Sequence, residues 1–161
     1  MIPIQLDING QTVALEVAPE LTLLDLLRDL GVTSVKKGCG EGDCGACGVL
    51  LDGVYVKSCL VLAAVANGRR VETVESLGDI DNPHPLQTAF VDAGAVQCGF
   101  CIPSMLLAAK SILDAHPEPT DEEIREGLDG NLCRCTGYVK QIEAVKNAAV
   151  VMRKREEESH E

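Results

Sequence analysis

Eight cysteines are the residues of this chain whose chemistry is most informative, and they fall into two groups. Cysteine thiolates bind soft metal ions, pair as disulfides or act as nucleophiles. One group lies in the segment 39–59 and the other in the segment 98–135. The first group is Cys39, Cys44, Cys47 and Cys59, and the second is Cys98, Cys101, Cys133 and Cys135.

The cellular compartment decides between these uses. No stretch of the chain approaches about 18 apolar residues without a charge, so we expect no membrane span. The chain starts with neither a basic segment nor a long apolar one, so we expect no secretory signal and a cytoplasmic location. Thiols stay reduced in the cytoplasm, which favours metal ligation over a disulfide framework. The net charge of −11, from 14 basic against 25 acidic residues, argues against a nucleic-acid partner.

The first group has an informative spacing. C-x4-C-x2-C followed by a distant cysteine is the plant-type ferredoxin pattern, which holds a [2Fe-2S] cluster. A loop around a cluster needs tight turns, positive φ values and amides that point inward, all of which glycine permits. Zinc is the alternative, although structural zinc sites usually pair two short C-x2–4-C units. The glycines that we assign to this loop are Gly38, Gly40, Gly42, Gly45 and Gly48, with Gly40, Gly42 and Gly45 as its cluster-binding turns.

The second group is less specific. Its C-x2-C unit is compatible with zinc, thiol redox chemistry or a cluster. Its C-x-C unit suits a two-iron cluster somewhat better than one tetrahedral zinc, because two thiolates so close in the chain are hard to turn toward a single ion. Spacing alone therefore leaves these alternatives open for the second group.

The elements around the first group predict an α+β lobe. Apolar residues alternate on both sides of the Asn9-Gly10 turn, which is typical of a β-hairpin. Thr22 is a candidate N-cap for a leucine-rich helix that ends at Gly31. The predicted elements are strands at 2–8 and 13–17, a helix at 23–30, a hairpin at 49–56 around Asp52-Gly53 and a strand at 71–74.

The second group lies among predicted helices. Helical spacing of apolar residues, a proline in a first turn and a capping box at Thr120 predict a small four-helix bundle. The helices are expected at 86–93, 103–113, 120–128 and 139–152. We divide the chain into a sheet domain at 1–76, a linker at 77–84, a helical domain at 85–152 and a charged tail at 153–161.

Three motifs resemble a known family. They are GCGEGDCGAC at 38–47, QCGFC at 97–101 and GNLCRCTGY at 130–138. In this order they resemble the iron-sulfur subunit of the molybdenum hydroxylases, a family that includes xanthine dehydrogenase and the aldehyde, carbon monoxide and nicotinate dehydrogenases. The resemblance implies a β-grasp ferredoxin-like domain and a four-helix domain, each with one [2Fe-2S] cluster held by its four cysteines.

The resemblance also implies a role and partners. The chain would be the non-catalytic electron-transfer subunit of an oxidoreductase, taking electrons from a molybdenum-pterin centre on a large subunit. The electrons would pass through the second-group cluster and then the first-group cluster to FAD on a medium subunit. Gln97 and Cys135 would contact the pterin cofactor, with Cys135 linking cluster to pterin. We expect a heterotrimer or its dimer.

Substrate contacts belong to the large subunit. We rank an N-heteroaromatic substrate such as xanthine first, with an aldehyde dehydrogenase, a carbon monoxide dehydrogenase or an aromatic acyl-CoA reductase as alternatives. A redox sensor or a zinc interaction module would use the same cysteines, but either would leave the second cluster and the Gln97 motif without a purpose.

The sequence departs from the family motifs in two places. Gly48 stands where Thr is common, and Ile102-Pro103-Ser104 stands where Thr-Pro-Gly is common. Neither is expected to touch a ligand, so we expect a changed environment rather than a lost cluster. We also expect Phe100 to fill the core beside the second group and Tyr138 to pack under the last loop.

Overall fold

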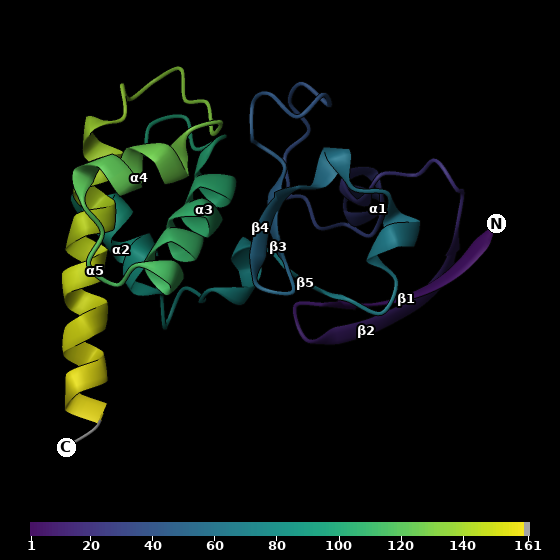
Figure 1. Cartoon of the computed structure of the whole chain (residues 1–161), viewed down its shortest axis with the longest axis horizontal. Helices are drawn as coiled ribbons and strands as arrows, with labels where there is room; N and C mark the ends of the chain where they lie inside the picture. The colour runs from purple at the N-terminus through teal and green to yellow at the C-terminus, as the bar shows by residue number, and fades with distance from the viewer. Residues whose placement is uncertain (160–161) are drawn as a thin grey trace.

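The computed structural model describes residues 1–159, and its buried apolar side chains form two separate cores. One core belongs to a five-stranded sheet with a helix, and the other to a group of four helices (Figure 1). This arrangement confirms the α+β fold class. The sheet lobe contains β1 (Ile2–Ile8), β2 (Gln11–Val17), α1 (Leu23–Asp29), β3 (Gly48–Leu51), β4 (Val54–Lys57) and β5 (Arg70–Glu72), and the helical lobe contains α2 (Pro85–Asp92), α3 (Ile102–Ala115), α4 (Asp121–Leu128) and α5 (Val139–Ser159).

The sheet has the strand order β2-β1-β5-β3-β4. Both predicted hairpins form, β1 with β2 and β3 with β4, each through a two-residue turn in the left-handed region. The central strand β5 pairs in parallel with β1, where Ile8 lies opposite Val71, and antiparallel with β3, where Leu51 lies opposite the same residue. The sequence pattern predicted these strands but not their order.

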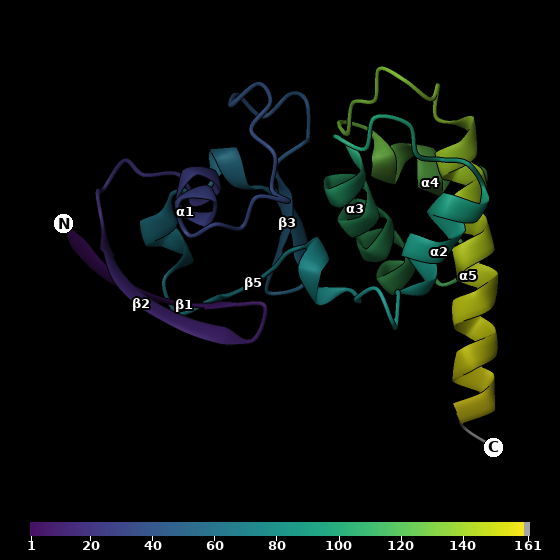
Figure 2. The same ribbon diagram turned by 180° about the vertical axis from the view of Figure 1, so that it is seen from behind.

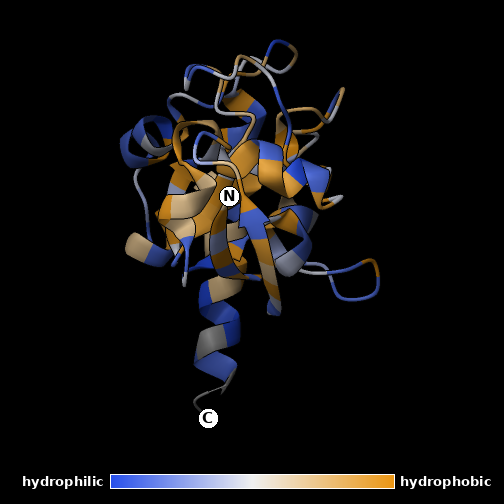
Figure 3. Ribbon diagram, turned by 90° about the vertical axis from the view of Figure 1, so that its right-hand side faces the viewer, coloured by the Kyte–Doolittle hydropathy of each residue, from blue (hydrophilic) through white to orange (hydrophobic). Residues whose placement is uncertain are grey.

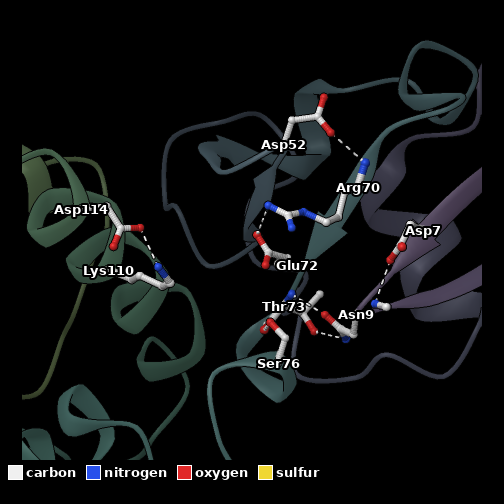
Figure 4. Close-up of polar contacts among 10 residues, drawn as sticks. Asp7, Asn9, Asp52, Arg70, Glu72, Thr73, Ser76, Lys110 and Asp114 are labelled. Carbon is white, nitrogen blue, oxygen red and sulfur yellow. Dashed lines mark hydrogen bonds and ion pairs between the residues drawn. The ribbon is translucent and has the colours of Figure 1, made fainter. Parts of the chain in front are cut away.

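Turn residues of both hairpins also bind the start of β5 and the residue that follows its end (Figure 4). Asn9, in the first turn, accepts a hydrogen bond from the Thr73 amide at 2.8 Å and donates to the Thr73 hydroxyl at 2.9 Å. Asp52, in the second turn, accepts from the Arg70 amide at 2.8 Å. The short central strand is therefore held at both ends, which fixes the β3–β4 hairpin relative to β1.

Helix α1 completes the core of the sheet lobe. Thr22 caps it as predicted, since its hydroxyl accepts a hydrogen bond from the Asp25 amide at 3.1 Å. Four leucines on one face of the helix pack in the same core as Ile4 and Leu6 of β1. The buried leucines are Leu23, Leu24, Leu26 and Leu27.

The helical lobe packs around Phe90 and Met105, two of its largest fully buried side chains. Capping boxes start α2 at His84 and α4 at Thr120. Helix α5 lies on the outer side of the lobe, away from the sheet (Figures 1 and 2).

Helix α5 continues past its expected end at residue 152, through the charged segment, to Ser159. The protruding end of this helix is coloured as mostly hydrophilic in Figure 3. His160 and Glu161 lie outside the described residues. No helix within residues 1–159 combines the length and the apolar character needed to cross a membrane.

Candidate metal centres

The first cysteine group gathers at one end of the sheet lobe. Cys39, Cys44 and Cys47 lie in the long loop between α1 and β3, and Cys59 lies in a 3-10 turn, Ser58–Leu60, directly after β4. The hairpin explains the long spacing between the last two cysteines. Strands β3 and β4 pair antiparallel, and the Ser58 amide donates to the Cys47 carbonyl at 3.2 Å, so both cysteines lie at the open end of one hairpin.

Backbone amides point at the sulfurs of this loop. The amides of Glu41 and Cys44 each donate to Cys39 Sγ at 3.4 Å, and the Cys39 amide donates to Cys44 Sγ at 3.3 Å. Hydrogen bonds from the Cys44 and Glu41 amides lower the pKa of the Cys39 thiol to about 6. The loop therefore favours a thiolate at Cys39, the form that binds metal.

Cys47 and Cys59 form the second pair of this group, and both are buried. Burial, and then the hydrogen bond with Cys47, raises the pKa of the Cys59 thiol to about 11. The four thiols thus contact each other as two pairs, an amide-lined outer pair and a buried inner pair.

The loop glycines have two different roles. Gly40, Gly42 and Gly45 have φ values of +75°, +88° and +70°, as expected for turns around a cluster. Gly38 and Gly48 do not adopt positive φ, so the conformational freedom of glycine does not explain why glycine stands at these two positions. A Cβ on Gly38 would lie 2.6 Å from Cys44 Sγ, and one on Gly48 would lie 2.2 Å from Tyr55 Oη. These two glycines are needed for space.

The second group gathers where two loops of the helical lobe meet. Cys98 lies in the loop between α2 and α3, Cys101 directly precedes α3, and Cys133 and Cys135 lie in the loop between α4 and α5. Cys101 contacts Cys133, and Cys98 contacts Cys135. This group therefore also consists of two pairs, each joining one loop to the other.

The two pairs differ in exposure. Burial, and then the hydrogen bond with Cys133, raises the pKa of the Cys101 thiol to about 12. Cys98 and Cys135 are exposed, and so is the neighbouring Gln97. The hydrogen bond with Cys98 raises the pKa of the Cys135 thiol. One pair thus faces the core and the other faces the surface, on the side of Gln97.

A buried glutamine supports Cys133 in a way that the sequence analysis missed. Burial would raise the pKa of the Cys133 thiol, but hydrogen bonds from the Thr136 hydroxyl, at 3.1 Å, and from the amides of Cys135 and Thr136 lower it to about 7. Gln141 is 0% exposed and donates to the Thr136 hydroxyl. Gln141 lies one helical turn before Val145 on the buried face of α5. A polar residue at such a core position must find a hydrogen-bond partner, and this was the signal in the sequence that could have identified it.

Two expectations about aromatic residues have different outcomes. Tyr138 does lie under the last loop, where its hydroxyl accepts from the Cys133 amide at 2.7 Å and donates to the Asn131 carbonyl at 3.1 Å. The expectation for Phe100 was wrong, because its side chain is 49% exposed rather than in the core. The tight turn at Gly99, with φ +84°, directs the chain before Cys101 along the surface.

The two cysteine groups lie close together although they belong to different lobes. The Leu132 amide, next to Cys133, donates to the Cys44 carbonyl at 2.9 Å. The loops of both groups lie at the same end of the molecule, the upper end in Figure 1. The two departures from the family motifs also meet here, since the Gly48 amide donates to Ser104 Oγ at 3.2 Å.

The donor set fits a two-iron cluster at each group. No three His, Cys, Asp or Glu side chains in residues 1–159 are gathered around one common point for a metal ion. The thiols meet in pairs, and a [2Fe-2S] cluster bound by four cysteines takes two thiolates at each iron. Amides directed at the sulfurs stabilise the negative charge that such a cluster carries.

Comparisons with known proteins agree with this chemistry. Residues 6–75 match a family described as a 2Fe-2S iron-sulfur cluster binding domain, and residues 73–146 match one described as a [2Fe-2S] binding domain. The small FeS subunit of nicotinate dehydrogenase from Eubacterium barkeri is 50% identical over 148 residues, which cover 91% of this chain and 94% of the relative.

Solved structures share the fold. Quinoline 2-oxidoreductase from Pseudomonas putida matches with a TM-score of 0.89 at 43% identity, over 94% of this chain and 96% of the other. The aldehyde oxidoreductase of Desulfovibrio desulfuricans matches with a TM-score of 0.92 at 44% identity, over 96% of this chain but only 17% of that much longer one.

Proposed function

The chain belongs to the iron-sulfur subunits of the molybdenum hydroxylases, the non-catalytic electron-transfer subunits of these oxidoreductases, and from this premise we propose its route and partners. It takes electrons from a molybdenum-pterin centre on a large subunit and delivers them to FAD on a medium subunit. The complex is a heterotrimer or its dimer. The single observation that carries this proposal is the presence of two complete sets of four cysteines, placed close together in two lobes.

In this proposal each cysteine group binds one [2Fe-2S] cluster, and each contacting pair of thiolates binds one iron. A bound cluster supplies one-electron redox chemistry. The pairs follow from the sulfur contacts described above. They are Cys39 with Cys44 and Cys47 with Cys59 in the sheet lobe, and Cys101 with Cys133 and Cys98 with Cys135 in the helical lobe.

Hydrogen-bond donors of the chain stabilise the thiolates. In the sheet lobe these donors are the amides of Cys39, Glu41 and Cys44. In the helical lobe they are the amides of Cys135 and Thr136 and the hydroxyl of Thr136, which is itself held by Gln141. Donors to a ligating sulfur favour the more negative, reduced state and raise the reduction potential. Both lobes therefore provide donors that raise the reduction potential of the cluster they hold.

The exposed pair of the helical lobe faces the molybdenum subunit. Cys98 and Cys135 lie at the surface beside Gln97, and we assign Gln97 and Cys135 to the pterin contact. Electrons then leave the helical lobe for the sheet lobe near the Leu132–Cys44 hydrogen bond. The sheet-lobe cluster, with the exposed Cys39 at its edge, faces the FAD subunit.

We propose an N-heteroaromatic substrate for the complex. The names of two relatives support this class, because nicotinate and quinoline are both ring compounds that contain nitrogen. The aldehyde oxidoreductase of Desulfovibrio desulfuricans supports the alternative, an aldehyde substrate. We also propose a cytoplasmic location, because cluster ligation requires thiols that stay reduced.

Iron analysis tests the proposal directly. The purified protein should be red-brown and contain about four iron and four acid-labile sulfide per chain, because each group of four cysteines holds two of each. Removing the iron with a chelator should bleach the colour and lower the thermal stability, since small metal-binding lobes couple folding to metal binding. A colourless protein that contains zinc and no iron would contradict the proposal.

Cys135→Ser tests the pterin contact. In the purified complex we expect this variant to slow reduction of the clusters by substrate more than it slows their reduction by dithionite, because only the first route passes the pterin. Stopped-flow absorbance measures both rates. Cys98→Ser is the matched control, since Cys98 is the exposed partner of Cys135, and it should affect both routes alike. Equal losses on both routes in Cys135→Ser would mean that this residue is only a cluster ligand.

A further inference from the structure

A buried hydrogen-bond network connects the two lobes between the cysteine groups. Tyr55 of β4 donates from its hydroxyl to Asn131 Oδ1 at 2.5 Å, and the hydroxyls of Tyr55 and Ser104 are 2.7 Å apart. Ser104 of α3 donates to the Gly45 carbonyl and accepts from the Gly48 amide at 3.2 Å. The network thus contains two residues of the helical lobe and three of the sheet lobe.

The two hydroxyls of this network can share their hydrogen atoms in more than one way. The Gly45 carbonyl and Asn131 Oδ1 each lie within reach of both hydroxyls, and either hydroxyl can donate across the Tyr55–Ser104 contact. In every arrangement the Gly48 amide donates to Ser104. Ser104 and Asn131 are 1% and 3% exposed, so water does not compete for these bonds. The side-chain NH2 of Asn131 has no partner in the described part of the chain, so the residue contributes to this network as an acceptor.

Each end of the network lies next to a predicted cluster ligand. Gly45 follows Cys44 directly, and Gly48 follows Cys47. Ser104 lies in the first turn of the helix that starts after Cys101, and Asn131 is two residues before Cys133. A movement of the network would therefore move both cysteine groups relative to each other.

The lobes are also packed without free space at this place. A Cβ on Gly48 would lie 2.2 Å from Tyr55 Oη and 2.3 Å from Ser104 Oγ, and one on Gly45 would lie 2.1 Å from the Gly130 carbonyl oxygen. Glycine at these two positions lets the backbone of the sheet lobe approach the helical lobe closely enough for the hydroxyls to bridge them.

We propose that Tyr55, Ser104 and Asn131 are positioning residues that hold the two clusters at a fixed separation and orientation, and thereby set the rate of electron transfer between them. The proposal rests on the proposed function, because it requires both clusters. The proposal also assigns a role to the contact between Gly48 and Ser104. With Ser104 and Tyr55 in these positions, there is no room for a side chain on residue 48.

Magnetic coupling between the reduced clusters measures this geometry. Two reduced clusters are both paramagnetic, and their dipolar interaction splits the low-temperature EPR signals by an amount that depends on separation and orientation. We expect Tyr55→Phe and Ser104→Ala to retain about four iron per chain, the content of two [2Fe-2S] clusters. Both variants should change this splitting. Flash reduction should show slower transfer between the clusters in both variants.

Thr136→Val is the matched control. It removes a hydroxyl that binds Cys133 Sγ and Gln141 within the helical lobe and contacts no residue of the network. This variant should alter the signal of one cluster and leave the splitting unchanged. An unchanged splitting and transfer rate in Tyr55→Phe and Ser104→Ala would overturn the proposal, and so would loss of iron from both, because the network would then serve folding alone. A wild-type protein without iron would instead overturn the proposed function.

Discussion

Replacing Cys101 by serine should remove the cluster of the helical lobe and destabilise that lobe, while the cluster of the sheet lobe remains. Cys101 is 8% exposed and belongs to the helical core at the start of α3. Burial raises the pKa of its thiol to about 12, so the site retains a proton until iron displaces it. A serine hydroxyl is a harder ligand than a thiol and gives up its proton far less readily. We therefore expect serine not to replace Cys101 as an iron ligand.

Iron content and thermal unfolding measure the effect. We expect iron to fall from about four to about two per chain, since one of two four-cysteine sites is lost. We expect the helical signal at 222 nm to melt at a lower temperature. Cys39→Ser is the comparison, because it removes an exposed ligand of the other site and should leave the four helices at their original melting temperature. Retention of four iron by Cys101→Ser would contradict the assignment of this residue as a ligand.

Local signals in the sequence predicted most of the elements. The Asn9-Gly10 turn, the Thr22 cap and the capping box at Thr120 each act over a few residues, and each forms as expected. Their stabilising contacts lie within one turn of the chain, so a short segment contains the necessary information. Local signals did not predict that α5 extends to Ser159, because the charged residues after Met152 carry no pattern that marks the end of a helix.

Contacts between distant segments could not be predicted in the same way. The parallel pairing of β1 with β5, the pairing of Cys98 with Cys135 and the contact of Gly48 with Ser104 each join residues that are far apart in the chain. The second cysteine group shows this most clearly. Its spacing left zinc, redox and cluster chemistry open, and only the fold brings its two loops together in pairs.

The amino-acid composition also did not predict the role of the two tyrosines. A chain with two tyrosines, two phenylalanines and no tryptophan builds its cores from aliphatic side chains. Both tyrosines instead use their hydroxyls beside the cysteine loops, Tyr55 between the lobes and Tyr138 under the second group. A buried hydroxyl must find a partner, so each ring fixes a loop as well as filling space.

Gly45→Ala should strongly destabilise the contact between the two lobes. Gly45 has φ +70°, and a Cβ there would lie 2.1 Å from the Gly130 carbonyl oxygen and 2.9 Å from Asn131 Cα. Both are backbone atoms of the other lobe, which no side-chain rotation can move away. The left-handed conformation costs an alanine about 1–2 kcal/mol, and forcing the lobes apart adds roughly 1–3 kcal/mol or more, as overpacking does.

Gly40→Ala separates these two costs. Gly40 lies in the same loop with φ +75°, but nothing lies within 4 Å of its Cβ position. It should therefore show only the conformational cost of about 1–2 kcal/mol and keep the contact between the lobes. Denaturant unfolding gives the difference in stability, and hydrogen exchange at the Leu132 amide reports the contact directly, because that amide donates to Cys44 of the other lobe. Equal destabilisation and equal protection of Leu132 in the two variants would mean that the lobes do not depend on this close approach.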